Sequence, residues 1–376
     1  MNCCTVLHLV DDEKIINRVR NLFEESLPDK NLFLCFLNPE GKAQLVKPAG
    51  NLFFVKNNQL PEGVDLSSIK KVVIHCLNYH KVLFYSTYIK QQLPTYWIMW
   101  GADIYNDLLY SKGYKLFYEP FYYYCQNWKT YIAKILIRLG LWINYRQEIL
   151  GFIEHHVTHF ISGKEEFDLM CHYYPKEMRN IKNREFFYYP IDDVLGAGLL
   201  HAKAEGNVIL LGNSASFTNN HTYGMKFLSK VDIGDKCVKT PISYGGSVLW
   251  RNHIKRRGNR LFGKQYEPIE DFMSLADYNR LMITAEVYIY GSWRQEAFGN
   301  IVIALYLGAK VFLSNKSVLL KSFKRQGIIL FELEKMTSES LLVPLSEEER
   351  MFNRDNMIKM FNKERLQAIV KELWDC

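Results

Sequence analysis

A polar turn led by glycine separates two apolar segments between residues 207 and 230. The run Val208–Leu211 predicts a buried strand, and the sequence after the turn is typical of a helix. The turn is built from Gly212, Asn213, Ser214, Asn219, Asn220 and His221. Because free N–H groups and the positive end of a helix dipole meet at such a turn, it favours an anion such as a phosphate. An ordinary capped strand–helix turn is the alternative interpretation.

A second strand–turn–helix pattern lies at residues 288–314. Its polar turn presents Arg294, Gln295, Glu296, Gly299 and Asn300. The planar guanidinium of Arg294 can bind two oxygens of a diphosphate at once. Tyr244, in the segment 237–246, is expected to contact a nucleoside or to form part of a plain strand-ending turn. The two patterns together predict a site for a nucleoside diphosphate.

Short apolar segments alternate with helical periodicity along the chain. In the first half the apolar segments include 5–10, 70–77 and 94–105, and a second series begins at residue 207. This alternation predicts an α/β fold with largely parallel sheets, whose ligands bind at the carboxyl ends of the strands.

The chain of 376 residues is long enough for two domains. We expect an N-terminal Rossmann-like domain over 1–188, a glycine-containing hinge over 189–206, and a C-terminal Rossmann-like domain over 207–345. A C-terminal helix is expected over 346–376, because Ser346 and Glu349 have the spacing of a capping box.

The composition is that of a folded protein with an anionic partner. Hydrophobic residues make up 48% and charged residues 23% of the chain, which excludes disorder. The net charge of +7 and the pI of about 8.8 predict a nucleotide, a phospholipid surface or a nucleic acid as partner. The eight cysteines form no C-x-x-C pair, so we expect free thiols. The sequence has neither the pattern of a signal peptide nor the roughly 18 apolar residues of a membrane span, so we expect a cytoplasmic protein.

Several motifs, in collinear order, carry a resemblance to a known family. They are "YWIMWGADIYNDLLYSKGYKLFYEP" (96–120), "LLGNS" with "NNH" after it, and "RQEAFGN" followed by "LGAKVFLS". The chain resembles the 4-acetamido-4,6-dideoxygalactose (Fuc4NAc) transferases that act on lipid II of enterobacterial common antigen. Asp12, Asn17 and Arg18 fall where that family carries an Asp and an Asn-Arg pair. The chain departs from the family turn at Glu296, Ala297 and Phe298, where the family is richer in Gln and Gly.

The resemblance implies a GT-B glycosyltransferase with two Rossmann-like lobes, an interdomain cleft and a membrane-facing, acceptor-binding N-terminal lobe. It implies a nucleotide-sugar donor, with dTDP as the nucleotide, and a polyprenyl-diphosphate-linked acceptor at the inner face of the bacterial plasma membrane. In two-lobed glycosyltransferases the Glu of an "E-x-F-G" turn commonly contacts hydroxyls of the donor sugar or ribose, which implies that role for Glu296. A helix-capping glutamate is the alternative.

Glycosyl transfer requires stabilisation of the departing diphosphate and activation of an acceptor hydroxyl. The chain contains no D-x-D motif, so we expect no metal and no cofactor. The Gly212–Ser214 turn and Arg294 would then stabilise the diphosphate. An inverting enzyme also needs a base in its first lobe, for which Asp103 is the first candidate and Asp12 the second.

Each of these acceptor-side candidates also has a structural interpretation. Asp103 would cap the following helix, and Asp12 would cap the first helix or bind Arg18. Asn17 and Arg18 are expected on the acceptor side. His75 is expected there too, or as a core histidine in the run 70–77.

An aromatic and basic segment spans residues 117–150. Its stripe at helical spacing consists of Trp128, Tyr131, Ile132, Ile135, Leu139, Trp142 and Ile143. The stripe predicts either a core-facing helix or an interfacial helix that docks on an anionic membrane surface. A second basic segment, 251–264, is expected to form a solvated helix face or to add positive potential near the phosphate-binding site.

Other functions remain open at the level of the sequence. They are a transferase with a different donor or a soluble acceptor, a sugar-nucleotide epimerase, a nucleic-acid-binding module, and a lipid-surface protein without catalysis. We expect no nucleic-acid partner, because the sequence has no RNP or helix-turn-helix pattern.

Overall fold

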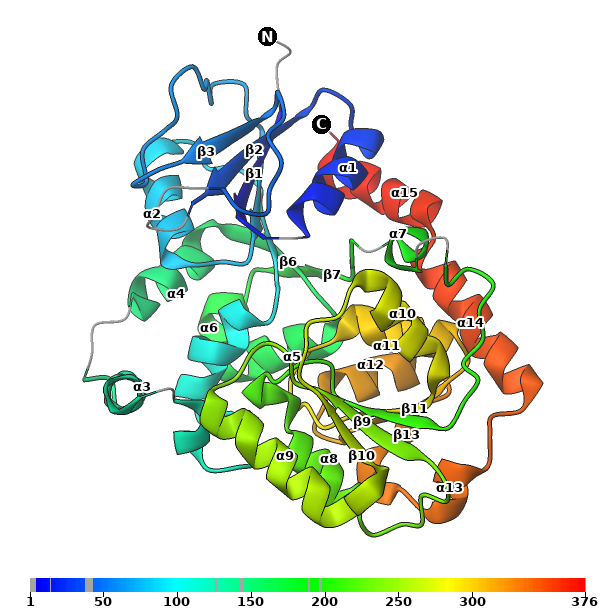
Figure 1. Ribbon diagram of the computed structural model, residues 1–376. Coiled ribbons are helices and arrows are strands. Elements are labelled where there is room, and N and C mark those ends of the chain that lie inside the picture. The colour runs from blue at the N-terminus through cyan, green and yellow to red at the C-terminus, as the bar shows by residue number, and fades with distance from the viewer. Residues whose placement is uncertain are drawn as a thin grey trace. The chain divides into compact units, whose positions relative to one another are not determined.

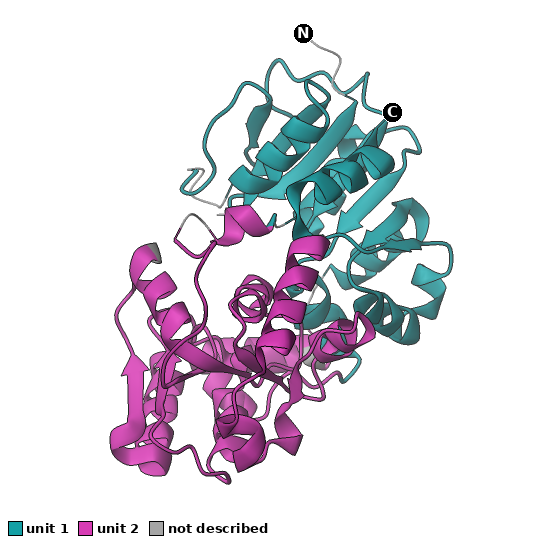
Figure 2. Ribbon diagram, turned by 90° about the vertical axis from the view of Figure 1, so that its right-hand side faces the viewer, with its two compact units in different colours: residues 1–113, 143–190, 361–376 teal, residues 114–142, 191–360 magenta. Residues whose placement is uncertain are grey.

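The computed structural model of the protein describes residues 5–13, 15–37, 43–125, 127–141, 145–188, 190–195 and 198–375. The chain forms two compact units (Figure 2). Unit 1 consists of residues 1–113, 143–190 and 361–376, and unit 2 of residues 114–142 and 191–360. Each unit contains one parallel sheet, as the alternation of apolar segments predicts.

Unit 1 has a seven-stranded parallel sheet with the order β3-β2-β1-β4-β5-β6-β7 (Figure 1). The strands are β1 (Val6–Asp11), β2 (Asn31–Phe36), β3 (Leu52–Val55), β4 (Lys71–His75), β5 (Thr95–Ile98), β6 (Val157–Ile161) and β7 (Lys182–Arg184). The helices are α1 (Ile16–Ser26), α2 (Tyr79–Tyr88), α4 (Arg146–His156), α5 (Lys164–Tyr173), α6 (Pro175–Met178) and α15 (Lys363–Trp374), with a π-helical segment at Ile104–Leu109. The strand order reverses between β1 and β4, which makes this pair the topological switch point of the unit.

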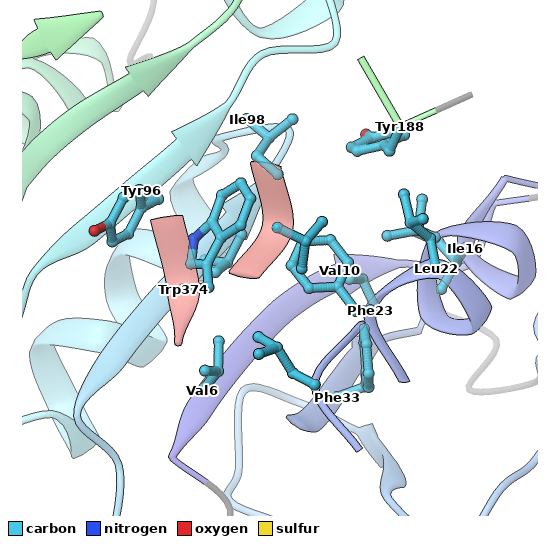
Figure 3. Close-up of a cluster of buried hydrophobic side chains, with 14 of the residues drawn as sticks. Val6, Val10, Ile16, Leu22, Phe23, Phe33, Tyr96, Ile98, Tyr188 and Trp374 are labelled. Atoms are coloured by element: carbon cyan, nitrogen blue, oxygen red, sulfur yellow. The ribbon is translucent and has the colours of Figure 1, made fainter. Parts of the chain in front are cut away.

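The hydrophobic core of unit 1 includes the end of the chain. Trp374, on α15, is fully buried, and its ring centroid lies 5.1 Å from that of Phe23 on α1 and 5.4 Å from that of Tyr96 on β5. Figure 3 shows these side chains together with Val10 from the first strand. The last helix therefore completes a core that the first strand begins.

Unit 2 has a six-stranded parallel sheet with the order β10-β9-β8-β11-β12-β13. The strands are β8 (Val208–Leu211), β9 (Cys237–Pro241), β10 (Tyr266–Ile269), β11 (Ala285–Tyr290), β12 (Lys310–Leu313) and β13 (Phe331–Glu332). The helices are α3 (Trp128–Arg138), α7 (Ile191–Leu195), α8 (His221–Leu228), α9 (Val248–Phe262), α10 (Leu275–Thr284), α11 (Phe298–Tyr306), α12 (Val318–Arg325), α13 (Ser338–Leu342) and α14 (Glu347–Phe361). Here the switch point lies between β8 and β11, so the turns after these two strands share one edge of the sheet.

The units differ from the expected domains in two segments. Residues 114–142, expected in the N-terminal domain, belong to unit 2. The expected helix over 346–376 is divided at Asn362, whose side chain accepts a hydrogen bond from the Arg365 amide and so starts α15. The capping box is confirmed, because the Ser346 amide donates to Glu349 Oε2 (2.8 Å) and the Glu349 amide donates to Ser346 Oγ (3.2 Å). The expected hinge over 189–206 contains the short helix α7.

Candidate functional site

The turn after β8 depends on a glycine at its first position. Gly212 has a φ of +73°, and its amide donates to the Ile289 carbonyl oxygen of β11 (2.9 Å). A Cβ at this position would lie 2.7 Å from His221 Nε2 and 3.0 Å from Asn219 Oδ1. The Asn213 amide donates to the same Asn219 oxygen (3.1 Å). The turn is therefore closed tightly against the start of α8, with Ser214 buried in it.

His221 begins α8 and is fully buried. Burial, which outweighs the opposite effect of a hydrogen bond with the Ser214 backbone, lowers the pKa of His221 to about 3. The imidazole is therefore neutral at physiological pH. It supplies hydrogen-bonding capacity to the turn without a positive charge.

Asn220 is engaged within unit 2. Its Oδ1 accepts a hydrogen bond from the Tyr118 amide and its Nδ2 donates to the Leu116 carbonyl oxygen, both at 3.0 Å. This side chain, predicted to bind the donor, thus fixes the segment around residues 116–118 on the turn. A direct contact with a ligand would require one of these hydrogen bonds to be replaced.

The turn after β11 carries a guanidinium and a carboxylate close together. Arg294 Nη2 lies 3.7 Å from Glu296 Oε1, and both side chains are largely buried. Ser292 Oγ lies 3.2 Å from Glu296 Oε2 and 3.1 Å from the Arg294 carbonyl oxygen, so the serine hydroxyl helps to shape the turn. Ala297 takes a left-handed conformation (φ +58°) immediately before α11. The predicted residues Gln295, Gly299 and Asn300 are partly exposed, in this turn and the first turn of α11.

The turns after β8, β9 and β11 touch one another. A Cβ at Gly291, just after β11, would lie 2.7 Å from the Asn220 carbonyl oxygen. After β9, the Tyr244 carbonyl oxygen accepts a hydrogen bond from the Ala215 amide (2.8 Å). Tyr244 is 51% exposed, and partial burial together with the negative charge of Glu296 raises its pKa. The structure thus brings the predicted donor-binding residues of three separate segments to one edge of the unit 2 sheet.

In unit 1, Asp12 and Asn17 hold a loop. The Asp12 carboxylate accepts hydrogen bonds from the amides of residues 44, 45 and 46 at 2.6, 3.0 and 2.7 Å. Burial acts to raise the pKa of Asp12, but these three amides lower it below its ordinary value. Asn17 Nδ2 donates to the Leu45 carbonyl oxygen and Asn17 Oδ1 accepts from the Lys47 amide, each at 2.9 Å. Arg18 is exposed on α1, apart from these contacts.

Asp103 is engaged by groups of its own unit. Its carboxylate accepts hydrogen bonds from Trp97 Nε1 (2.7 Å), the Trp100 amide (3.1 Å) and the Leu77 amide (3.2 Å). Burial raises its pKa, and these hydrogen bonds act in the opposite direction. Asp103 therefore ties the segments after β4 and β5 together, which is a structural role distinct from the predicted one of a base.

His75 lies in the core of unit 1. It is fully buried, and its Nε2 lies 3.1 Å from His8 Nδ1, while His8 Nε2 lies 3.1 Å from Asn31 Oδ1. Burial lowers the pKa of His75 well below its ordinary value and that of His8 to about 3. The core interpretation of His75 fits this arrangement, in which the pair stays uncharged.

Two residues that the sequence analysis did not select also lie at the switch points. Ser292 shapes the turn after β11, and Asp11, the last residue of β1, pairs with the buried Lys81. Asp11 and Asp12 are adjacent in the sequence, and the sequence alone does not indicate that Asp12 binds a loop whereas Asp11 pairs with a lysine. Within the described residues no group of three or more His, Cys, Asp or Glu side chains is placed to hold a metal ion.

The aromatic helix α3 is exposed. None of its described residues is buried, and Trp128 is 67% exposed, while Leu139 and Leu141 directly after the helix are 64% and 71% exposed. The core-facing interpretation of this stripe is therefore wrong, while Trp142 and Ile143 lie outside the described residues. No helix in the described part of the chain is both long enough and apolar enough to cross a membrane.

The basic segment 251–264 forms most of α9 and is not solvated on every face. Trp250, Ile254 and Phe262 face the core of unit 2. Arg257 Nη1 lies 3.2 Å from Glu119 Oε1, so part of its charge is neutralised within the unit.

Solved structures that match almost the whole chain, and therefore both units, identify the fold. The chain is similar to a glycosyltransferase from Rickettsia africae (13% identity, 99% of each chain covered, TM-score 0.60). It is similar to the sucrose-phosphate synthase of Thermosynechococcus elongatus (10% identity, 98% of each chain, TM-score 0.59). It is also similar to an E. coli structure described as trehalose-6-phosphate bound with UDP-2-fluoro glucose (10% identity, 98% of this chain and 100% of the other, TM-score 0.57). The expected GT-B fold is confirmed.

A family profile matches residues 154–373, more than half of the chain, which include all the turns of unit 2 described above. Its description is 4-alpha-L-fucosyltransferase, glycosyl transferase group 56. The match agrees with the resemblance that the sequence motifs carry, and it makes the chain an enzyme. The chain belongs to the glycosyl transferase group 56 family.

Proposed function

We propose that this glycosyltransferase moves a deoxyamino sugar of the Fuc4NAc type from a dTDP-linked donor to a polyprenyl-diphosphate-linked saccharide, in the synthesis of a bacterial surface polysaccharide. The observation that carries the proposal is the contact of three turns at the carboxyl edge of the unit 2 sheet. This edge is where parallel sheets bind nucleotides. The motifs at 96–120 and 291–300 support the choice of donor and acceptor class.

The groups at this edge suit a leaving diphosphate. The turn at residues 212–214 precedes α8, whose first N–H groups and dipole favour negative charge. Arg294 adds a guanidinium, which forms an ion pair with Glu296 at 3.7 Å and can bind two oxygens of a diphosphate. In the reaction the acceptor oxygen bonds to the anomeric carbon, and the bond from that carbon to the diphosphate oxygen breaks. Its electron pair leaves with the nucleoside diphosphate, whose charge these groups stabilise without a metal ion.

Glu296 and Tyr244 are proposed to bind the sugar and the nucleoside. Glu296 Oε2 accepts a hydrogen bond from the Ser292 hydroxyl, and the carboxylate can accept further hydrogen bonds from sugar hydroxyls. Tyr244 offers an exposed ring at the same edge, which is suited to packing against a nucleoside.

The helix α3 is proposed to dock the enzyme on the inner face of the plasma membrane, as a peripheral protein on the cytoplasmic side. Trp128, Tyr131 and Ile132 are exposed on it, and Lys129 and Lys134 add positive charge. Aromatic residues favour the headgroup region, and each basic residue near an anionic surface contributes about 1 kcal/mol. A lipid-linked acceptor would be presented at that surface.

The donor assignment is tested by thermal stabilisation with dTDP, UDP and GDP sugars. A ligand bound at 100 times its Kd raises the free energy of unfolding by about 2.7 kcal/mol, and we expect dTDP sugars to raise the melting temperature most. Arg294→Ala should abolish this stabilisation, whereas Arg280→Ala, which removes an exposed arginine of the same unit, should retain it. Equal affinity of both variants for the donor would refute the role of Arg294.

The acceptor assignment is tested by transfer to a synthetic polyprenyl-diphosphate-linked disaccharide, with and without EDTA. We expect transfer in both conditions, and transfer only to water-soluble saccharides would favour the soluble-acceptor alternative. Sedimentation with anionic vesicles should fall in a Trp128→Ser/Ile132→Ser variant. A matched Phe352→Ser/Met351→Ser variant, exposed on α14, should sediment as the wild type does.

A further inference from the structure

Unit 1 has its own topological switch point, and one carboxylate stands at it. Asp11 is the last residue of β1, and Cys76 and Leu77 follow the neighbouring strand β4. In open parallel sheets the space beyond the carboxyl ends of two such strands is where ligands bind.

A buried lysine holds this carboxylate. The side chain of Lys81, on α2, is 0% exposed, and its Nζ lies 2.5 Å from Asp11 Oδ2. The ammonium also donates to the carbonyl oxygens of His75 (2.5 Å) and Cys76 (2.9 Å), so its three N–H groups all have acceptors. Burying an ammonium costs several kcal/mol unless a counter-charge and hydrogen bonds compensate. Lys81 therefore fixes where the Asp11 carboxylate lies.

The backbone around Lys81 is held in a conformation that side chains rarely adopt. Cys76, which supplies one of the carbonyl oxygens, has a φ of +58°. The next amide, of Leu77, donates to Asp103 (3.2 Å), so Asp103 supports the turn that receives Lys81. Non-glycine residues in this region cost about 1–3 kcal/mol and cluster at functional sites.

Of Asp11, Asp12 and Asp103, Asp11 has the largest remaining capacity to accept hydrogen bonds. Its side chain is 29% exposed, and within the described residues its side-chain donors are Lys81 and, at 3.4 Å from each oxygen, Asn78 Nδ2. By contrast, three protein N–H groups bind Asp12 and three bind Asp103. A hydroxyl that approaches the carboxyl end of β1 can thus donate to Asp11 Oδ1 without displacing a protein group.

We propose that Asp11 is the catalytic base of the glycosyl transfer and that Lys81 is its positioning residue. Asp11 accepts the hydrogen bond of the attacking hydroxyl and takes its proton as the oxygen bonds to the anomeric carbon. The bond to the diphosphate breaks in the same displacement, so the configuration at that carbon inverts. This inference deepens the proposed function, but it depends only on glycosyl transfer and not on the identity of the nucleotide or the lipid.

The test compares Asp11→Asn with Asp65→Asn, which removes an exposed carboxylate from a loop of the same unit. The donor is whichever nucleotide sugar stabilises the wild type most, and two rates are measured. One is transfer to the lipid-linked acceptor, and the other is the slow hydrolysis of the donor without acceptor, in which water replaces the hydroxyl. For Asp11→Asn both rates should fall about 10²–10⁴-fold, with the thermal shift caused by the donor unchanged. Asp65→Asn should keep both rates.

Asp11→Asn leaves Lys81 buried without a counter-charge, so the double variant Asp11→Asn/Lys81→Met provides a folded alternative. It should recover the stability lost in the single variant and remain inactive. Hydrolysis within threefold of the wild type in either folded variant would overturn the proposal, as would loss of donor binding or a product of retained configuration. If dTDP-Fuc4NAc gives no turnover while another nucleotide sugar does, the proposed donor fails and Asp11 is tested with that other sugar.

Discussion

The substitution Gly212→Ala tests the donor turn most directly. A Cβ at Gly212 would lie 2.7 Å from His221 Nε2 and 3.0 Å from Asn219 Oδ1. Because both side chains are buried, neither can move into solvent to make room for it. A non-glycine residue at a φ of +73° costs about 1–2 kcal/mol by itself. Forcing an extra methyl group into packed surroundings adds about 1–3 kcal/mol. The free energy of unfolding of unit 2 should therefore fall by about 2–5 kcal/mol.

Gly327→Ala is the matched control. Gly327 lies in the same unit with a φ of +78°, and a Cβ there would meet nothing within 4 Å. It should therefore lose only the 1–2 kcal/mol of the left-handed backbone. The difference between the two variants isolates the cost of the close contacts.

The assay is thermal unfolding with and without donor. In a unit of this size each kcal/mol lowers the melting temperature by about 2–4 °C, so the variants should differ by several degrees. Gly212→Ala should also lose most of the stabilisation by donor, because His221 and Asn219, which close the proposed donor turn, must move. Equal melting temperatures for the two variants, with donor stabilisation intact in both, would refute the packing of this turn and its role.

Three further outcomes follow from the contacts. Asp103→Asn should lower the free energy of unfolding of unit 1 by about 1–3 kcal/mol, because its NH₂ group cannot accept from the Trp97 indole, and unchanged stability would contradict this role. Trp374→Ala should cost about 3–5 kcal/mol and leave the separate unfolding of unit 2 unchanged, as measured by calorimetry. Stability should be greatest near pH 6.5. Below it, protons bind the unfolded but not the folded His8 and His221, whose pKa is about 3, and each lowers stability by up to about 1.4 kcal/mol per pH unit. Above it, stability falls as the pH rises to about 8, because Glu166, whose pKa burial raises to about 8, keeps its proton in the folded state but has lost it in the unfolded state. Urea midpoints that stay constant from pH 5 to 8 would contradict these assignments.

The parallel α/β architecture could be predicted because most strands are continuous apolar runs. The strands that escaped prediction lack this signal. β6 (Val157–Ile161) contains Thr158 and His159, β7 consists of Lys182, Asn183 and Arg184, and β10 contains Glu267 and Pro268. β7 and β10 lie at an edge of their sheet, where one side needs no partner and such residues are tolerated.

The sequence predicted which turns carry the proposed donor-binding residues, but it did not predict the contacts that these residues make. Strand–turn–helix patterns marked the turns at 212–214 and 294–296, and adjacent strands bring these turns together. The sequence could not reveal that Asn220 binds residues 116–118, because a hydrogen bond over 102 residues leaves no local pattern. The same long-range contact explains why residues 114–142 belong to unit 2. In unit 1, the neighbouring Asp11 and Asp12 have different partners, since β1 ends at Asp11 and Asp12 lies in the turn after it.

The three-segment construction of unit 1 affects the order in which a nascent chain can fold. Unit 2 has all of its residues once position 360 has left the ribosome, whereas unit 1 still lacks α15 with Trp374 at that point. Segments 1–113 and 143–190 of unit 1 therefore expose an apolar surface against α1 until α15 has been translated and covers it. A truncation before α15 would thus damage the unit whose first segment is translated earliest, and leave apolar surface that chaperones must cover.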